Sequence, residues 1–233
     1  MLCDIRTDLG MQTPERLFKY LPSRFVERVL RRGDLLFRNL SYFRRIEENG
    51  RGDLLEGLHM DYPDNPIKIE TTDGRVKWEG RAAFLNRVNS DKLYVFCLSR
   101  ELSPALYGEF GADACIEITD APEFLRRSER VIATQVRFAE SGLLHGPVLY
   151  YVPNQPLDAD VTDVRVIPFC KHESYRLQVE YRLAVATRGG LSLTRQIVNK
   201  LFSFEEDVAA CTDGSRHVIV GAIHDIARVH CRS

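Results

Sequence analysis

The stretch Tyr175-Arg176-Leu177-Gln178-Val179-Glu180-Tyr181-Arg182-Leu183-Ala184-Val185-Ala186 decides the fold, because apolar and polar side chains alternate along it. At strand spacing one face carries Leu177, Val179, Tyr181, Leu183 and Val185, and the other carries Gln178, Glu180 and Arg182. The pattern predicts a strand that holds an acid between an amide and a guanidinium, over a polar substrate. An ordinary exposed strand face with a cross-strand ion pair has the same pattern, and the pattern alone favours that interpretation.

Working outward, most of the chain has strand patterns bounded by turn residues. Helices are predicted over 23–32, from Ser103 onward and over 121–127, and long loops over 49–66 and 153–163. Residues 76–78 and 82–88 fit either a hairpin or a short helix. Further strands are predicted at 17–21, 35–38, 93–99, 114–118, 131–138, 147–152, 164–167, 191–198 and 217–220. Strands joined by short turns, with few helices, predict an α+β fold built on antiparallel sheets.

Composition predicts one globular domain over residues 1–233. The net charge of −1 provides no field that would attract nucleic acid or an anionic membrane. Six cysteines without a Cys-x-x-Cys pair favour a reducing, cytoplasmic compartment. No signal peptide is expected, because Asp4, Arg6 and Asp8 interrupt the start of the chain, and no apolar run reaches the ~20 residues of a membrane helix.

A series of short motifs runs through the chain in a fixed order: Leu17-Phe18-Lys19-Tyr20, Val29 to Phe37, Gly52 to Gly57, Phe96 to Ser99 with Tyr107, Gly111 to Ile118, Phe169-Cys170-Lys171, Glu180-Tyr181-Arg182-Leu183 and Ile219-Val220-Gly221. This series resembles a large family of uncharacterised bacterial domains, many of them encoded near mobile elements and defence genes. The Glu-Tyr-Arg motif is the most specific of the series.

The order of the elements in turn resembles the ADP-ribosyltransferase fold, including its toxin branches that modify DNA and RNA. That resemblance implies split antiparallel β-sheets with flanking helices, NAD as the substrate, and a toxin or phage-defence role. It implies Glu180 as the catalytic carboxylate. It also implies a NAD-binding set of Lys19, Tyr20, Arg38, Ser99, Tyr107, Gln178 and Arg182. The chain departs from the family pattern in having Lys19 in place of His or Arg, and Cys97-Leu98-Ser99 in place of Ser-Thr-Ser.

These residue types suit that chemistry. Cleavage of the nicotinamide–ribose bond passes through an oxocarbenium-like sugar, and a fixed carboxylate such as Glu180 stabilises the developing charge. Arg38 offers a bidentate contact to the pyrophosphate where Lys19 offers a point charge, and Tyr20 and Tyr107 offer aromatic walls. Each has a structural alternative: a surface salt bridge for Arg182, core packing for the tyrosines, and a strand-end cap for Ser99.

Other functions stay open. The fold could be a catalytically inactive module that binds a nucleotide or a partner protein. The arginine-rich first fifty residues, with Tyr42 and Phe43, could bind single-stranded nucleic acid in a nuclease-like effector. The acceptor of a transferase would be a nucleic acid or a protein, with an antitoxin or other neutralising partner. No metal site is expected, because the histidines and cysteines match no common zinc spacing.

Overall fold

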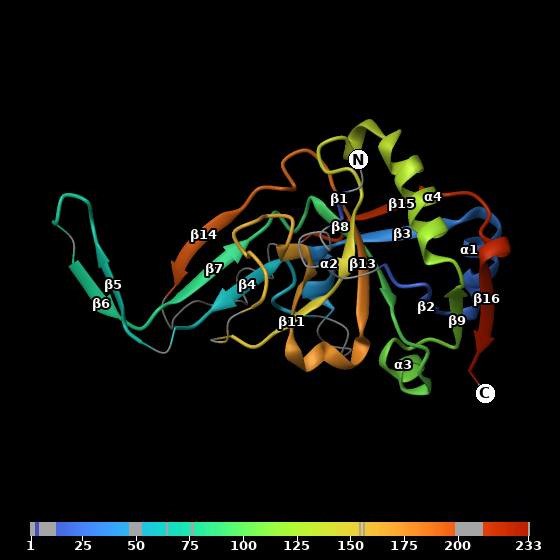
Figure 1. Ribbon diagram of the computed structural model, residues 1–233, viewed down its shortest axis with the longest axis horizontal. Helices are drawn as coiled ribbons and strands as arrows, with labels where there is room; N and C mark the ends of the chain where they lie inside the picture. Colours follow the sequence, from blue (N-terminus) through green and yellow to red (C-terminus); the bar gives the residue numbers. More distant parts are fainter. Residues whose placement is uncertain are drawn as a thin grey trace.

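The structure is a computed structural model that describes residues 3–4, 13–46, 53–63, 65–75, 77–153, 155, 157–198 and 212–232. Arg51, Gly52 and Cys211 lie outside the described residues. Its α-helices are short apart from the last: α1 (Val26–Arg32), α2 (Leu40–Arg45), α3 (Pro104–Glu109) and α4 (Ala121–Ala133). The mixed α+β architecture built mainly on antiparallel strands is confirmed (Figure 1).

The largest sheet has nine strands and carries Lys19, Arg38, Ser99, Glu180 and Arg182. Its main path runs β1 (Cys3–Asp4), β10 (Leu144–Pro147), β13 (Glu180–Ala186), β8 (Leu93–Ser99), β2 (Leu17–Leu21), β9 (Ala114–Ile118) and β16 (Ala227–Cys231). Two more strands, β3 (Asp34–Asn39) and β15 (Ser215–Ile219), join it through β8. Every pair is antiparallel except β1 with β10.

The sheet forks at one edge of β8. β13 pairs with β8 along its whole length, so both remaining neighbours share the opposite edge. There β3 pairs with Tyr94 and Val95, and β2 pairs only with Ser99. The intervening part of β8 is left between a β2 branch (β2, β9 and β16) and a β3 branch (β3 and β15). The fork therefore opens a gap inside the sheet.

The two faces of the sheet are covered differently. On one face α4 packs Phe124, Leu125 and Ile132 onto a core that includes Tyr181 and Leu183 of β13. On the other face a 3₁₀ turn, Ile167–Phe169, and strand β12 (Cys170–His172) lie over Ala184 and Ala186. β13 is consequently buried on both sides, and so are its polar side chains.

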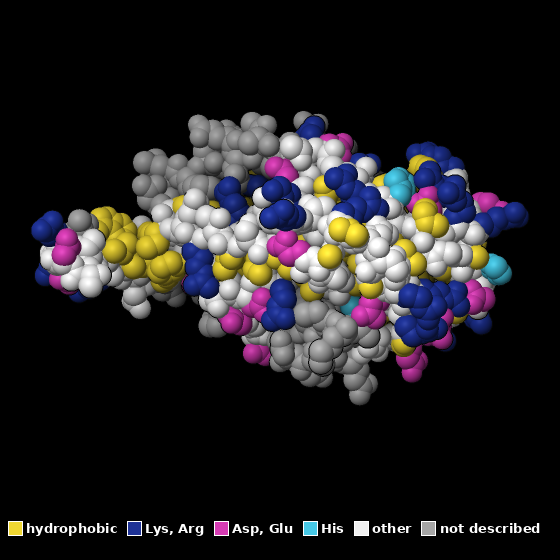
Figure 2. Space-filling view, turned by 90° about the horizontal axis from the view of Figure 1, so that it is seen from above, with side chains coloured by type: hydrophobic (Ala, Val, Ile, Leu, Met, Phe, Trp, Pro, Cys, Tyr) yellow, Lys and Arg dark blue, Asp and Glu magenta, His cyan; other side chains and the backbone are white. Residues whose placement is uncertain are grey.

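A second part of the molecule extends away from the nine-stranded sheet (Figure 1). Strands β4 (Leu58–Asp61), β7 (Ala83–Arg87) and β14 (Thr194–Val198) form a three-stranded sheet, and β5 (Ile67–Glu70) with β6 (Lys77–Gly80) forms a hairpin beyond it. Figure 2 shows hydrophobic side chains gathered toward this end of the molecule. A short pair, β11 (Leu149–Tyr151) with β12, completes the strands that are described.

Several sequence predictions are wrong in this structure. Residues 131–138 are not a strand: α4 continues to Ala133, because Phe124, Ser128 and Ile132 recur at helical spacing and are all buried. Residues 164–167 are not a strand either: 164–166 form a turn and Ile167 begins the 3₁₀ turn, since a proline follows directly at Pro168. The predicted loop 49–66 contains β4, and β16, which was not predicted, follows β15.

The opening stretch is a strand only from Glu180 onward. Residues Glu173–Gln178 form a 3₁₀ helix and leave Leu177 82 % exposed, so the predicted apolar face does not extend that far. The face of Glu180 and Arg182 is not an exposed strand face either, because both side chains are almost fully buried.

Candidate functional site

A pocket of about 390 Å³ lies in the fork of the sheet. This volume falls in the range of small-molecule sites, roughly 300–1,000 Å³. The segment from Val95 to Ser99 of β8 forms part of its wall, and both branches contribute to the rest. The basic, acidic and histidine side chains of the lining are Lys19, Arg28, Asp34, Arg38, Lys171, Glu180, Arg182 and His217. Five of these are Lys or Arg and two are acids, while Glu56 and Asp213 pair with Arg182 and Arg38 from outside the lining, so a small excess of positive charge is left to attract an anionic ligand.

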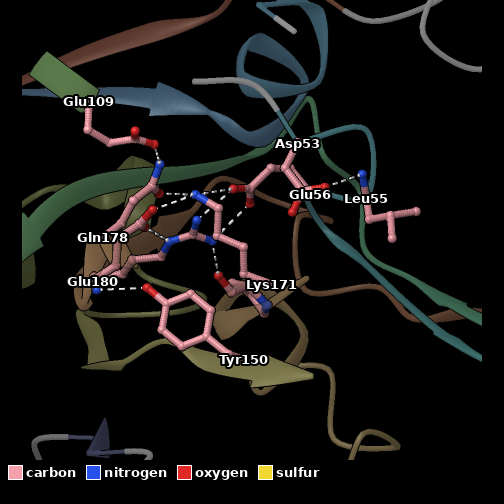
Figure 3. Close-up of polar contacts among 10 residues, drawn as sticks. Asp53, Leu55, Glu56, Glu109, Tyr150, Lys171, Gln178 and Glu180 are labelled. Atoms are coloured by element: carbon pink, nitrogen blue, oxygen red, sulfur yellow. Dashed lines mark hydrogen bonds and ion pairs between the residues drawn. The ribbon is translucent and has the colours of Figure 1, made fainter. Parts of the chain in front are cut away.

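Glu180 lies on this wall and is held by two cations (Figure 3). Its Oε1 forms an ion pair with Lys171, and its Oε2 accepts a hydrogen bond of 2.8 Å from Nε of Arg182. Its backbone amide donates to the hydroxyl of Tyr150 at 2.9 Å. With only 2 % of its surface exposed, the carboxylate is fixed in position by partners that the pocket itself provides.

A second buried acid, Glu56, completes the cluster. Arg182 donates to both of its oxygens, at 2.6 and 2.9 Å, and to the carbonyl of Pro168 at 2.8 Å. Lys171 lies 3.5 Å from Glu56 and donates to Oε1 of Gln178 at 2.8 Å. Two acids therefore face two cations, and removal of any one member leaves a buried charge without its partner.

This pairing determines the ionisation of the cluster. Burial would raise the pKa of Glu180, but Arg182 and Lys171 outweigh it and lower the pKa to about 2. Burial would lower the pKa of Lys171, but Glu180 and Glu56 raise it instead. Burial, with Glu180 close by, raises the pKa of Tyr150 to about 12. At neutral pH Glu180 is an anion and Lys171 a cation, so Glu180 is an electrostatic group and a poor proton acceptor.

A strained turn places Gln178 and Glu180 on the cluster. Val179 between them has φ 43° and ψ 46°, a left-handed conformation that a β-branched residue rarely adopts. The turn is fastened to β8: Ser99 Oγ donates to the Gln178 carbonyl at 3.0 Å, and the Arg100 amide donates to the Val179 carbonyl at 2.9 Å. Such strain costs about 1–2 kcal/mol and clusters at functional sites.

The structure brings most of the predicted site residues to this pocket. Besides Glu180, the lining includes Lys19, Tyr20, Arg38, Ser99, Gln178 and Arg182. Lys19 is half-buried and crosses the gap of the fork: its Nζ donates to the Cys97 carbonyl at 2.8 Å and lies 4.4 Å from the ring centroid of Phe96. Burial lowers the pKa of Lys19, while Cys97 and Glu180 oppose that effect.

Arg38 and Ser99 have different surroundings. Arg38 lies on β3 with its guanidinium 4.3 Å from the Tyr42 ring and 3.0 Å from a carboxylate oxygen of Asp213. Ser99 faces Glu180 across the β8–β13 ladder and is buried. The Ser99 hydroxyl donates to the carbonyl of Gln178 in the turn at Val179, so Ser99 supports the end of β13 that carries Glu180.

The two predicted tyrosines pack against each other, with ring centroids 5.1 Å apart. The Tyr20 hydroxyl accepts from the Ser103 amide at 2.8 Å and donates to the Glu101 carbonyl at 3.1 Å. Tyr107 is buried against Tyr20 and is not among the residues that line the pocket. Its place is thus in a small core behind the pocket wall.

Sequence reasoning missed Lys171 and Glu56 as site residues. Both lie in motifs that carried the family resemblance. Glu56 and Arg182 are 126 positions apart, and Lys171, nine positions before Glu180, lies on a different strand, so no strand or helix periodicity connects either residue with Glu180. It also missed Asp34 and His217, which lie on different strands of the β3 branch and meet only through the β3–β15 pairing.

The arginine-rich front of the chain is mostly neutralised. Arg44 is buried and donates to the Leu54 carbonyl at 3.1 Å. Other arginines form ion pairs, which join Arg16 to Glu117, Arg28 to Asp34, Arg31 to Glu27 and Arg38 to Asp213. The nucleic-acid surface suggested by the sequence remains a prediction.

The described residues include neither a cluster of metal ligands nor a membrane-spanning helix. Among these residues no group of three or more His, Cys, Asp or Glu side chains could hold a metal ion. No helix in the described part of the chain is long and apolar enough to cross a membrane. Comparisons with models of protein families, with curated proteins and with solved structures found no match.

Proposed function

We propose that this protein is a NAD-dependent ADP-ribosyltransferase of toxin or phage-defence type, which transfers ADP-ribose to a nucleic acid or protein acceptor. The observation that carries the proposal is Glu180, an ionised carboxylate held by Lys171 and Arg182 in the wall of a basic and aromatic pocket. Breaking the nicotinamide–ribose bond leaves positive charge on the sugar, and a carboxylate fixed in advance stabilises that charge without reorganising.

Glu180 keeps the capacity to bind ribose. An ionised carboxylate offers roughly four acceptor positions, two on each oxygen. Lys171 takes one on Oε1 and Arg182 takes one on Oε2. The remaining positions have no protein donor among the described residues, and the ribose hydroxyls would reach them through the 2 % of the residue that is exposed to the pocket, while the two cations prevent the carboxylate from rotating away.

Other residues of the pocket suit the pyrophosphate and the rings of a dinucleotide. Arg38 and Arg28 supply guanidinium groups for a pyrophosphate, and Lys19 adds a point charge from the other branch. Tyr42 and Phe43 supply aromatic surface for a base or the nicotinamide ring. The forked antiparallel sheet is in keeping with the split sheets that the family resemblance implies.

A second candidate is a module that binds a nucleotide without cleaving it. The observation that favours it is the balance of charge around Glu180: Lys171, Arg182 and Glu56 form with it a compact set that would also serve as a purely structural core. Such a module would use the basic lining for affinity and leave the glycosidic bond intact.

The test is nicotinamide release and transfer of label from NAD in the presence of cell extract. The variant Glu180→Asp keeps the charge balance of the cluster and withdraws the carboxylate by one methylene. We expect transfer to fall about 100-fold, because a displacement of about 1 Å at the reacting centre has that effect. Glu117→Gln is the control, since Glu117 is also a buried, paired acid but lies outside the pocket.

NAD affinity measured by calorimetry separates the candidates. Binding without nicotinamide release supports the non-catalytic module, and neither binding nor release refutes both. Transfer that persists undiminished in folded Glu180→Asp protein refutes the role of Glu180. Growth arrest on expression, relieved by the same substitution, would support the toxin role and a neutralising partner. We place the activity in the cytoplasm, where Cys97, Cys115, Cys170 and Cys231 stay free thiols.

A further inference from the structure

A histidine–aspartate pair lies on the β3 branch of the fork, in the wall of the same pocket. Nδ1 of His217 on β15 is 2.5 Å from Oδ1 of Asp34 on β3. Asp34 is buried with 4 % of its surface exposed, and its Oδ2 forms an ion pair with Arg28. His217 is exposed on the pocket side, where both residues form part of the lining.

This contact defines the tautomer of the imidazole. Burial would raise the pKa of Asp34, but the hydrogen bonds from His217 and Arg28 outweigh it and lower the pKa, so the carboxylate is ionised. Nη2 of Arg28 lies 3.4 Å from Nδ1 of His217, but the Asp34 contact is much shorter, and because an ionised carboxylate only accepts, Nδ1 carries the hydrogen and donates it to Asp34. In the neutral ring the lone pair is then on Nε2, which is the arrangement of an oriented general base.

The site needs a base that Glu180 cannot supply. With its pKa lowered to about 2 by Arg182 and Lys171, against the effect of burial, Glu180 does not take up a proton near neutral pH. Lys19 is engaged as a donor to the Cys97 carbonyl. A hydroxyl acceptor, whose proton is as firmly held as that of water, becomes a strong nucleophile only when a base removes the proton as it attacks.

We propose that His217, oriented by Asp34, is the general base that activates a hydroxyl group as the acceptor of ADP-ribose. This inference rests on the proposed function. The acceptor oxygen forms a bond to C1′ of the ribose as the C1′–nitrogen bond breaks. The electron pair of that bond leaves with nicotinamide, which departs neutral, and the acceptor proton moves to Nε2 of His217. The chemistry is shared by water, a protein hydroxyl and a ribose hydroxyl.

The test uses the full chain with labelled NAD in three arms: buffer alone, RNA, and nucleic-acid-free protein extract. His217→Asn keeps a donor toward Asp34 and removes Nε2, so the pair survives without the base. We expect transfer to the hydroxyl acceptor to fall about 10²–10⁴-fold, with the NAD dissociation constant unchanged. His224→Ala, an exposed histidine that is not among the pocket residues, is the control and should leave transfer unaltered.

Added imidazole separates a base from a structural residue. It should restore at least part of the lost rate in His217→Ala, and Asp34→Asn should lower the turnover number with little change in the Michaelis constant for NAD. A loss without rescue by imidazole, an undiminished rate in His217→Asn, or label found on amines or thiols would overturn the inference alone. Absence of nicotinamide release from the wild-type protein in all three arms would refute the proposed function and this inference with it.

Discussion

Among single residues, Asp53 is a buried acid whose pKa the fold raises. The side chain is buried close to Glu56, and its Oδ2 has no hydrogen-bond partner, while Oδ1 accepts from the Leu55 amide at 2.8 Å. Burial, reinforced by the charge of Glu56, raises the pKa of Asp53 to about 6. The folded protein therefore holds a proton on Asp53 over a range of pH in which the unfolded chain has released it.

This difference has a defined sign. Between pH 4 and 6 the folded state binds more protons than the unfolded state at Asp53, so its contribution to stability falls as the pH rises. The Asp53→Asn variant has no carboxyl group at this position, so its free energy of unfolding does not fall in this way as the pH rises. We expect the advantage of Asp53→Asn over wild type in the free energy of unfolding to grow by about 2 kcal/mol from pH 4 to 7. Urea unfolding at several pH values measures it.

The exposed Asp158→Asn variant is the control for this comparison. Its difference from wild type should stay constant over the same range. A constant difference for Asp53→Asn as well would show that Asp53 ionises alike in both states. Comparison with wild type at each pH also cancels the opposite trend that Glu180 contributes, because both proteins share it.

The sequence reveals Glu180 and Arg182 but not how they are held. Alternation along one strand is a local property, and it correctly placed both side chains on a face opposite to Tyr181 and Leu183. It could not show that this face is buried, because the covering residues Glu56 and Lys171 come from elements whose positions depend on the whole fold. The mutual distance of Asp34 and His217 escaped prediction for the same reason.

Among the helices and strands, the junction at Val179 is the most strained in the described chain. It joins the 3₁₀ helix Glu173–Gln178 to β13, and Val179 is the one residue other than glycine with a positive φ in the described residues. A glycine would adopt this conformation freely, whereas any side chain with a Cβ meets the same clash as valine. The junction therefore stores strain beside Glu180.

A pair of substitutions isolates this strain. Val179→Gly and Val179→Ala both remove the valine side chain, so their difference reports the backbone alone. We expect the glycine variant to be more stable by about 1 kcal/mol. At Val229 on β16 the order should reverse, with alanine more stable by about 0.5–1 kcal/mol. Chemical unfolding of the four variants measures their free energies of unfolding. If the alanine variant is the more stable one at both positions, the backbone at Val179 is not strained.

The local sequence pattern of α4 was sufficient to predict where the helix begins but not where it ends. Asp120 caps α4 by accepting from the Glu123 amide at 3.0 Å, and the predicted helix begins there. Its end was misplaced because Val131 and Ile132 are β-branched and suit a strand equally well. Packing of Ile132 into the core decided between the two, and that contact is not visible in the local sequence.

Across the whole molecule, the C-terminal part of the described chain ties the two branches together. It supplies β15 to the β3 branch, crosses at Gly221, and then supplies β16 to the β2 branch. At the crossing the Val220 amide donates to the Gly33 carbonyl at 3.0 Å. Gly33 has φ 59°, and a Cβ there would lie 2.1 Å from the Gly221 carbonyl oxygen, so only glycine fits.

We expect Gly33→Ala to lower the free energy of unfolding by about 2 kcal/mol more than Gly142→Ala does. Gly142 is the matched control, because its φ of 60° imposes the same backbone strain while no atom lies within 4 Å of its added Cβ. Urea unfolding of both variants measures the difference. Equal losses in the free energy of unfolding would mean that the backbone at the crossing shifts easily to make room for a Cβ and does not hold the two branches together.

The fork has an evolutionary consequence. In the described part of the chain, the ladder that carries Lys19 and the ladder that carries Asp34 and His217 are connected by the crossing at Gly221 but do not pair with each other, and each is closed by its own late strand. Substitutions that reshape one wall therefore need not disturb the register of the other. The wall that carries Asp34 and His217 can therefore vary in sequence while Lys19 keeps its position on β2.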